Sequence, residues 1–125
     1  GQIINVCSGA GQYDPPVPAD QGGWGFAYGA SKAALIRMAG CIRRELGGQG
    51  VRAYSVNPGV VATEAVTATL GDDGTLAQRY GALPPEAIAQ ALFWLATSPQ
   101  APAVARGKDM LDLPELVKTQ GLWQP

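Results

Sequence analysis

The stretch FAYGASKAALIRMAG, residues 26–40, places a tyrosine and a lysine four positions apart, Tyr28 and Lys32. On a helix, side chains at i and i+4 lie on one face about 6 Å apart, so these two groups would project into the same space. A free tyrosine has a pKa of about 10, and a neighbouring ammonium group favours its phenolate. Upstream, Ser8 follows an apolar stretch and could donate a hydrogen bond to a substrate oxygen. Together the three side chains could polarise a carbonyl group or deprotonate an alcohol.

The composition narrows the chemistry further. The 125 residues include no histidine, which excludes Ser-His-Asp triads, imidazole acid–base chemistry and most zinc sites. The two cysteines, Cys7 and Cys41, have no CxxC spacing, so we expect both to be small core residues in a reducing, cytoplasmic setting. A net charge of −1 offers no basic field for nucleic acid, and no apolar run approaches the roughly 18 residues that span a bilayer. We therefore expect a soluble protein that binds neither nucleic acid nor membrane.

The elements that must position these side chains alternate between strands and helices. QIINVCS (2–8) is apolar on both faces and is typical of a buried strand in a parallel sheet, and VRAYSV (51–56) is a second strand that NPG interrupts. Between them, residues 27–46 form a helix whose face, begun by Tyr28 and Lys32, continues through Leu35, Ala39, Ile42 and Leu46. A second helix starts at Pro84 and Pro85, a short strand is expected in KDMLDL (108–113), and the tail from residue 114 is amphipathic at best.

This order, strand-helix-strand-helix-strand, predicts one α/β domain with parallel pairing and right-handed crossovers. Sheets of this kind bind ligands at the carboxyl ends of their strands. Ser8 ends the first strand, and NPG with the residues that follow it ends the second. Both segments are therefore expected at the ligand-binding edge.

In their order along the chain, NVCSGAG, YGASK and NPGVVAT resemble the motifs of the classical short-chain dehydrogenases/reductases, whose mark is Tyr-x-x-x-Lys with an upstream serine. The resemblance runs through residues 1–11 and 28–64 and more loosely through 79–99. It implies that Ser8 steadies the substrate oxygen and that Tyr28 is the general acid/base. It also implies that Lys32 lowers the pKa of Tyr28 and holds the nicotinamide ribose.

At the positions that match the family's P-G-x-x-x-T, the resemblance implies a second set of cofactor contacts. Backbone at Val61 and the hydroxyl group of Thr63 would hold the nicotinamide carboxamide, in a segment that begins with Pro58 and Gly59. The implied cofactor is NAD or NADP, and the implied substrate is a small molecule with a carbonyl or alcohol group. The family also uses the helix over residues 27–46 between subunits, so a homo-oligomer, or association with a cofactor-binding segment, is expected.

The sequence departs from the family's pattern in four places. Nothing in it matches the glycine-rich TGxxxGxG turn that takes the pyrophosphate, so we expect the C-terminal half of a Rossmann-like doubly wound parallel sheet, over residues 1–125, without the N-terminal dinucleotide-binding βαβ unit. The NAG segment that supplies a catalytic asparagine is also missing, and Asn5 is interpreted as structural. The loop between Ser8 and Tyr28 is longer than usual, and the end lacks the common D-G-G.

Several residues have a structural alternative. Ser8 could begin a turn, and Thr63 could cap the helix that starts after it. Trp24 and Phe26 could line a substrate pocket or only fix the loop. The acidic pairs Asp72–Asp73 and Asp109/Asp112 are interpreted as solvated turns rather than catalytic carboxylates.

Three functions remain open at this point. The first is an NAD(P)-dependent oxidoreductase that transfers hydride between nicotinamide and a carbonyl/alcohol pair, with Tyr28 as general acid/base. The second is a catalytically inactive, truncated or split chain that acts by associating with another subunit. The third is an epimerase or dehydratase of the extended branch, against which NPGVVAT (57–63) and the compact segment after Pro84 argue.

Overall fold

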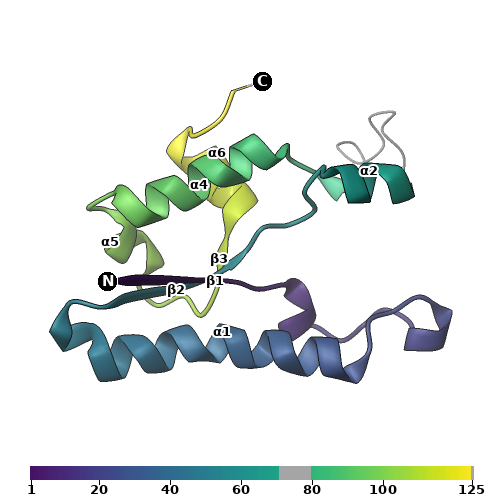
Figure 1. The fold of residues 1–125 in the computed structure, drawn as a ribbon, viewed down its shortest axis with the longest axis horizontal. Coiled ribbons are helices and arrows are strands. Elements are labelled where there is room, and N and C mark those ends of the chain that lie inside the picture. The colour runs from purple at the N-terminus through teal and green to yellow at the C-terminus, as the bar shows by residue number, and fades with distance from the viewer. Residues whose placement is uncertain (71–79, 125) are drawn as a thin grey trace. The chain divides into compact units, whose positions relative to one another are not determined.

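The computed structural model of the chain describes residues 1–70 and 80–124 and divides it into two compact units. The first unit contains Gly1–Asn57 and Ala105–Leu111, and the second contains Pro58–Val104 and Asp112–Pro125. Figure 1 shows the course of the chain through both. Each unit is described by itself below. No helix in the described part is long and apolar enough to cross a membrane.

The first unit is built on parallel strands. β1 (Gln2–Val6) pairs with β2 (Arg52–Asn57) in a parallel register that runs from Gln2 opposite Arg52 to Val6 opposite Val56. The sheet order is β1-β2-β3, where β3 (Leu111–Asp112) is the short strand expected in KDMLDL. The long helix α1 (Phe26–Leu46) connects β1 to β2 and lies along the sheet, as Figure 1 shows. The predicted α/β class with parallel pairing is confirmed.

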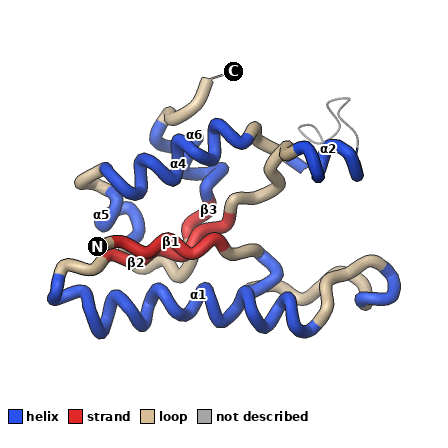
Figure 2. The backbone as a smooth tube through the Cα atoms, viewed as in Figure 1, coloured by secondary structure: helices blue, strands red, loops and turns tan. Residues whose placement is uncertain are grey.

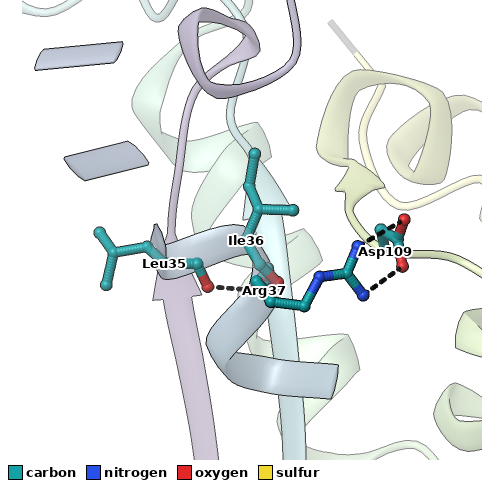
Figure 3. A network of polar contacts seen from close by, with 5 residues as sticks. Leu35, Ile36, Arg37 and Asp109 are labelled. Atoms are coloured by element: carbon teal, nitrogen blue, oxygen red, sulfur yellow. Dashed lines mark hydrogen bonds and ion pairs between the residues drawn. The ribbon is translucent and has the colours of Figure 1, made fainter. Parts of the chain in front are cut away.

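Polar side chains tie α1 to the two strands. The Ser55 hydroxyl group donates to the carbonyl oxygens of Leu35 at 2.9 Å and Ile36 at 3.2 Å, around the helical turn that Figure 3 labels. The Asn5 amide donates to the same Leu35 carbonyl at 3.4 Å, which gives this asparagine the structural role expected of it. Near the end of α1, the Arg43 guanidinium donates to the Ala53 carbonyl oxygen at 2.9 Å. These bonds fix the position of α1 along the strands and its rotation about its own axis.

The face of α1 that packs inward differs in part from the predicted one. Ile36 and Ala39 are its buried residues, and Leu46, at the far end, is 37% exposed. Of the two cysteines, Cys7 is buried as expected, but Cys41 is exposed, so its prediction as a core residue is wrong. The 3.6-residue period predicts which side of the helix faces the sheet. How much of that side is buried depends on the length of the strands that it packs on.

β1 is less buried than its apolar sequence predicts. Ile3 is 38% and Val6 is 49% exposed, whereas Tyr54 and Val56 of β2 are 2% and 0% exposed. In the described part of the chain β1 borders only β2, while β2 lies between two strands. The prediction of a strand covered on both faces is therefore wrong for β1 within this chain.

Among the described residues of the second unit, most lie in four helices: α2 (Glu64–Leu70), α4 (Pro85–Thr97), α5 (Ala101–Ala105) and α6 (Leu113–Gln120). α4 starts at the predicted proline pair, because proline suits the first turn of a helix, and it buries Ile88 and Leu95 on one face. Figure 2 shows α4 beside α6, which buries Leu113, Leu116 and Val117. The core of this unit is the contact between these two helices.

The helix α6 was not predicted from the sequence. The carboxylate of Asp112 accepts from the Glu115 backbone N–H at 2.9 Å, Pro114 lies in the first turn, and Gly121 ends the helix with φ +62°. An N-cap aspartate followed by proline and glutamate, with glycine after the last turn, is a complete helix signature over a short span. The signal was therefore present in the sequence.

The acidic residues singled out from the sequence have structural roles where the structure describes them. Asp112 caps α6, and Asp109 forms an ion pair at 3.3 Å with Arg37 of α1, as Figure 3 shows. Both partners of that pair are more than half exposed, so it contributes little to stability. Asp72 and Asp73 lie outside the described residues.

Candidate active site

The turn that follows β1 places Ser8. After Val6 the chain stays paired through Cys7, whose N–H donates to the Val56 carbonyl oxygen at 2.7 Å, and then enters a single 3₁₀ turn, η1 (Gly9–Gly11). The Ser8 hydroxyl oxygen accepts from the Ala10 N–H at 3.1 Å and so caps this turn. The structural alternative for Ser8 is thus realised. Accepting this bond uses a lone pair and leaves the hydroxyl proton able to donate.

Tyr28 and Lys32 lie together near the start of α1. The Lys32 Nζ is 5.6 Å from the centroid of the Tyr28 ring, and the same Nζ donates to the Val6 carbonyl oxygen at 3.4 Å. The Tyr28 side chain is 47% exposed. The lysine therefore connects the tyrosine to the carboxyl end of β1, two residues before Ser8.

The η1 turn packs directly on α1 beside this pair. A Cβ atom added at Gly29, next to Tyr28, would lie 3.3 Å from the Ala10 carbonyl oxygen. Ala10, two residues after Ser8, thus lies against Gly29, the residue after Tyr28. The structure therefore brings the three predicted catalytic residues into one region of the first unit.

The long loop before α1 forms one side of an open groove with a volume of about 350 Å³. Trp24 and Phe26 both line it, together with Tyr13, Asp14 and the small residues of α1 that face them. Phe26 is 91% exposed. Of the lining positions on α1, Gly29 and Ala33 directly follow Tyr28 and Lys32, about 100° around the helix from them, and Ala30 lies about 160° from both. The groove that Trp24 and Phe26 line therefore begins beside the face of α1 that carries the tyrosine and lysine and extends away from it.

The second predicted set, Pro58, Gly59, Val61 and Thr63, belongs to the second unit. Val61 forms a parallel bridge with Leu83, and the hydroxyl oxygen of Thr63 accepts from the Val66 N–H at 3.3 Å at the start of α2. The structural alternative for Thr63, a helix cap, is thus realised. A threonine hydroxyl group that accepts in a cap still has a proton to donate.

The donor set of these residues suits the nicotinamide end of a dinucleotide. Lys32 carries an ammonium group that would reach ribose hydroxyl groups, and Thr63 and the backbone near Val61 offer groups that would pair with a carboxamide. The sequence contains no TGxxxGxG turn for the pyrophosphate. Taken unit by unit, the first unit carries a donor suited to ribose hydroxyl groups, the second carries groups suited to a carboxamide, and the sequence has no match for the pyrophosphate turn.

Comparison with known proteins gives a consistent result. A family model described as short chain dehydrogenase matches residues 1–73. The chain is 36% identical over 104 residues to the NADP-dependent 3-hydroxy acid dehydrogenase YdfG of Escherichia coli strain K12, which covers 79% of this chain and 39% of that protein. The chain spans 37% to 39% of the length of the curated relatives it matches.

Solved structures agree with the family model. The angucycline C-6 ketoreductase LanV with bound NADP superposes with a TM-score of 0.65 at 29% identity, over 90% of this chain and 42% of that one. The 4-hydroxyisoleucine dehydrogenase complexed with NADH superposes with a TM-score of 0.57 at 28% identity, over 90% and 44% of the two chains. The predicted cofactor class, NAD or NADP, is thus the one these two neighbours hold.

Proposed function

Because this chain belongs to the short chain dehydrogenase family, we propose that it carries the catalytic half of an NAD(P)-dependent oxidoreductase that acts on a carbonyl/alcohol pair. The observation that carries this proposal is the position of the Lys32 Nζ, 5.6 Å from the Tyr28 ring centroid and 3.4 Å from the Val6 carbonyl oxygen. It places an ammonium group beside a half-exposed phenol at the carboxyl end of a parallel strand, where α/β sheets bind their ligands. We further propose that residues 1–125 belong to one partial Rossmann-type domain.

In this proposal Tyr28 exchanges a proton with the substrate oxygen. The Lys32 ammonium group lies 5.6 Å from the centroid of the Tyr28 ring, so a positive charge stands beside the side chain that exchanges the proton. Ser8 donates a hydrogen bond to the same substrate oxygen and keeps its proton, while its own oxygen still accepts from the Ala10 N–H. Bound nicotinamide supplies or accepts the hydride. The side chains handle only the proton and the charge on oxygen.

The cofactor contacts proposed for this chain fall into two groups. Lys32 and Tyr28 would hold the nicotinamide ribose, and the segment that begins with Pro58 and Gly59 would hold the carboxamide through Val61 backbone and the Thr63 hydroxyl group. NAD and NADP both fit these contacts, because the two cofactors differ only at the adenosine ribose. The bound forms of the solved neighbours, NADP and NADH, support this range.

The test is the substitution Tyr28→Phe, assayed with whatever segment supplies the adenosine site. The change removes one hydroxyl group from a half-exposed side chain and leaves the ring and the proposed Lys32 contact with the ribose in place, so cofactor affinity and thermal stability should change little. Turnover should fall by about 10²- to 10⁴-fold, as expected for a lost general acid/base. Tyr80→Phe is the matched control, because Tyr80 is 50% exposed and has no proposed role. Turnover of Tyr28→Phe within a few-fold of the parent would contradict the proposal.

A second candidate function, association without catalysis, is favoured by the exposed β1. Ile3 and Val6 leave apolar surface on a strand with one described neighbour, and such an edge invites pairing with another strand. We expect the 125-residue chain to form oligomers or to bind a strand-donating partner, with the mass measured by light scattering. A strictly monomeric solution whose amides in residues 3–6 are protected from exchange would rule this candidate out.

A further inference from the structure

Gly11, in the turn after β1, lies directly against α1. A Cβ atom added at Gly11 would lie 2.7 Å from the Ala33 backbone nitrogen, 2.7 Å from the Ile36 Cδ1 and 2.8 Å from the Lys32 carbonyl carbon. Carbon atoms in ordinary contact are about 3.5 to 4.0 Å apart. Gly11 is not among the glycines with positive φ, so its own backbone would accept any L-residue. Glycine is required at this position only because the helix backbone is so near.

Contacts of the residues before Gly11 show that the segment from Asn5 to Gly11 runs along α1. The Asn5 amide donates to the Leu35 carbonyl oxygen, and the Lys32 Nζ donates to the Val6 carbonyl oxygen, both at 3.4 Å. Beyond Ser8, the Ala10 carbonyl oxygen approaches Gly29. The contact points on α1 step back along the helix from Leu35 to Gly29 as the chain advances from Asn5 to Ala10, and Gly11 then lies against the helix between them, at Lys32 and Ala33. Ser8 lies in the middle of this segment, and its hydroxyl oxygen accepts from Ala10 within the same segment.

We propose that Gly11 is a positioning residue, whose close contact with the α1 backbone sets where the Ser8 hydroxyl group lies relative to Tyr28 and Lys32. A side chain at position 11 would separate the turn from the helix by about 1 Å, because two of the three nearest atoms are backbone atoms and do not move aside. The catalytic consequence rests on the proposed function: a displacement of about 1 Å within a catalytic group costs about 10²-fold in rate. The geometric consequence holds whatever the reaction is.

Gly9 provides a matched control in the same turn. A Cβ atom added there would meet the Tyr13 Cδ2 at 3.7 Å and the Asn57 Nδ2 at 3.9 Å, which are ordinary van der Waals contacts with side chains. Gly9→Ala and Gly11→Ala thus make the same chemical change two residues apart, and only the second meets the helix. A general effect of alanine on the turn would appear in both variants.

The first experiment is NMR spectroscopy of the 125-residue chain, without cofactor or turnover. In the parent and in Gly9→Ala, nuclear Overhauser effects should connect the Lys32 side chain to Val6 and the Ile36 δ-methyl group to Gly11. In Gly11→Ala the effect between Lys32 and Val6 should be lost or reduced several-fold. The double variant Gly11→Ala/Ile36→Val removes the nearest side-chain atom and should not restore it, because the contacts with the helix backbone remain.

The second experiment is kinetic, with the adenosine site supplied as for Tyr28→Phe. Gly11→Ala should lower turnover by about 10²-fold with cofactor affinity within about twofold of the parent, because Lys32 keeps its place on the helix. Gly9→Ala should stay within about twofold in both. Parent-like NMR contacts in Gly11→Ala, or their return in the double variant, would overturn the inference. If Tyr28→Phe keeps its turnover, the proposed function fails while the NMR comparison still decides the role of Gly11.

Gly29→Ala covers the case in which Gly11→Ala does not fold. This variant adds a methyl group on the helix side of the contact between α1 and the turn, because its Cβ atom would lie 3.3 Å from the Ala10 carbonyl oxygen. Alanine also favours the helix more than glycine does, so the melting temperature should be unchanged or higher. The inference expects turnover to fall a few-fold nevertheless, with a weakened contact between Lys32 and Val6. Parent-like turnover and contacts in Gly29→Ala would contradict it.

Discussion

Tyr28 and Lys32 in the first unit differ from Val61 and Thr63 in the second in what their functional groups already do. The Tyr28 phenol is half exposed, and the Lys32 ammonium holds a long bond of 3.4 Å to a backbone carbonyl oxygen. Val61, in contrast, is bridged to Leu83, and the Thr63 hydroxyl group caps α2. The first pair supports little of the fold, whereas the second pair lies in a segment that the backbone bridge and the helix cap hold in place.

This difference predicts whether a substitution changes mainly the activity or also the stability of the protein. Replacing a side chain of the first pair removes a group that supports little of the fold, so activity should change far more than stability. Replacing a residue of the second segment disturbs the backbone that carries the proposed carboxamide contacts, so stability and binding should change together. The predictions below separate these two behaviours.

The largest effect is expected for Lys32→Ala. This variant removes the ammonium group from beside Tyr28 and from the proposed ribose contact, so turnover and cofactor affinity should fall together, turnover by about 10²-fold or more. Thermal stability should stay close to that of the parent, because a partly exposed bond of 3.4 Å contributes little. Steady-state kinetics, calorimetry with NADH and NADPH, and thermal unfolding measure the three quantities. Lys108→Ala, at another exposed lysine, serves as the control. A Lys32→Ala variant that binds cofactor with the affinity of the parent would contradict the proposed ribose contact and, with it, the difference drawn between the two pairs of residues.

Gly59→Ala should destabilise the second unit. Gly59 has φ +68°, where an L-residue costs roughly 1 to 2 kcal/mol, and its added Cβ atom would lie 2.8 Å from the Pro114 Cγ. The free energy of unfolding, measured with denaturant, should fall by about 2 kcal/mol. The control is Gly81→Ala, with a similar φ of +62° and no atom within 4 Å of its Cβ position, which should cost less. Equal losses of unfolding free energy in the two variants would show that the clash with Pro114 contributes nothing to the destabilisation.

The smallest effect is expected for Thr63→Ala. The loss of the bond from the Val66 N–H should lower the stability of α2 by about 1 kcal/mol, seen as faster amide exchange at Val66. Thr63→Ser keeps the hydroxyl group and should keep both the slow exchange and the cofactor affinity. If Thr63→Ala lowered cofactor affinity without any change in exchange, the hydroxyl group would act on the ligand alone, and Thr63 would belong with Tyr28 and Lys32.

Several features of the fold and site could be predicted from the sequence because they depend on neighbours along the chain. The period of α1, the proline start of α4 and the spacing of Tyr28 and Lys32 are of this kind, and the structure places all three as expected. The exposure of Cys41 was not predictable, because it depends on how far the sheet extends over α1. The exposed apolar edge at Ile3 and Val6, in contrast, follows from the expected absence of the N-terminal βαβ unit that would border β1. The capping signature of α6 was local and was missed.

The sequence by itself determined the family motifs, the alternation of strands and helices, and the two residue types that stand on one face of α1. Only the tertiary structure showed that the turn after Ser8 lies against the helix backbone at Lys32 and Ala33, with no room for a Cβ atom at Gly11. A glycine with positive φ is forecast by its place after a helix, as at Gly121, because the backbone conformation is local. A glycine required by contact has ordinary backbone angles, and the atoms that exclude its side chain come from more than twenty residues away in the sequence.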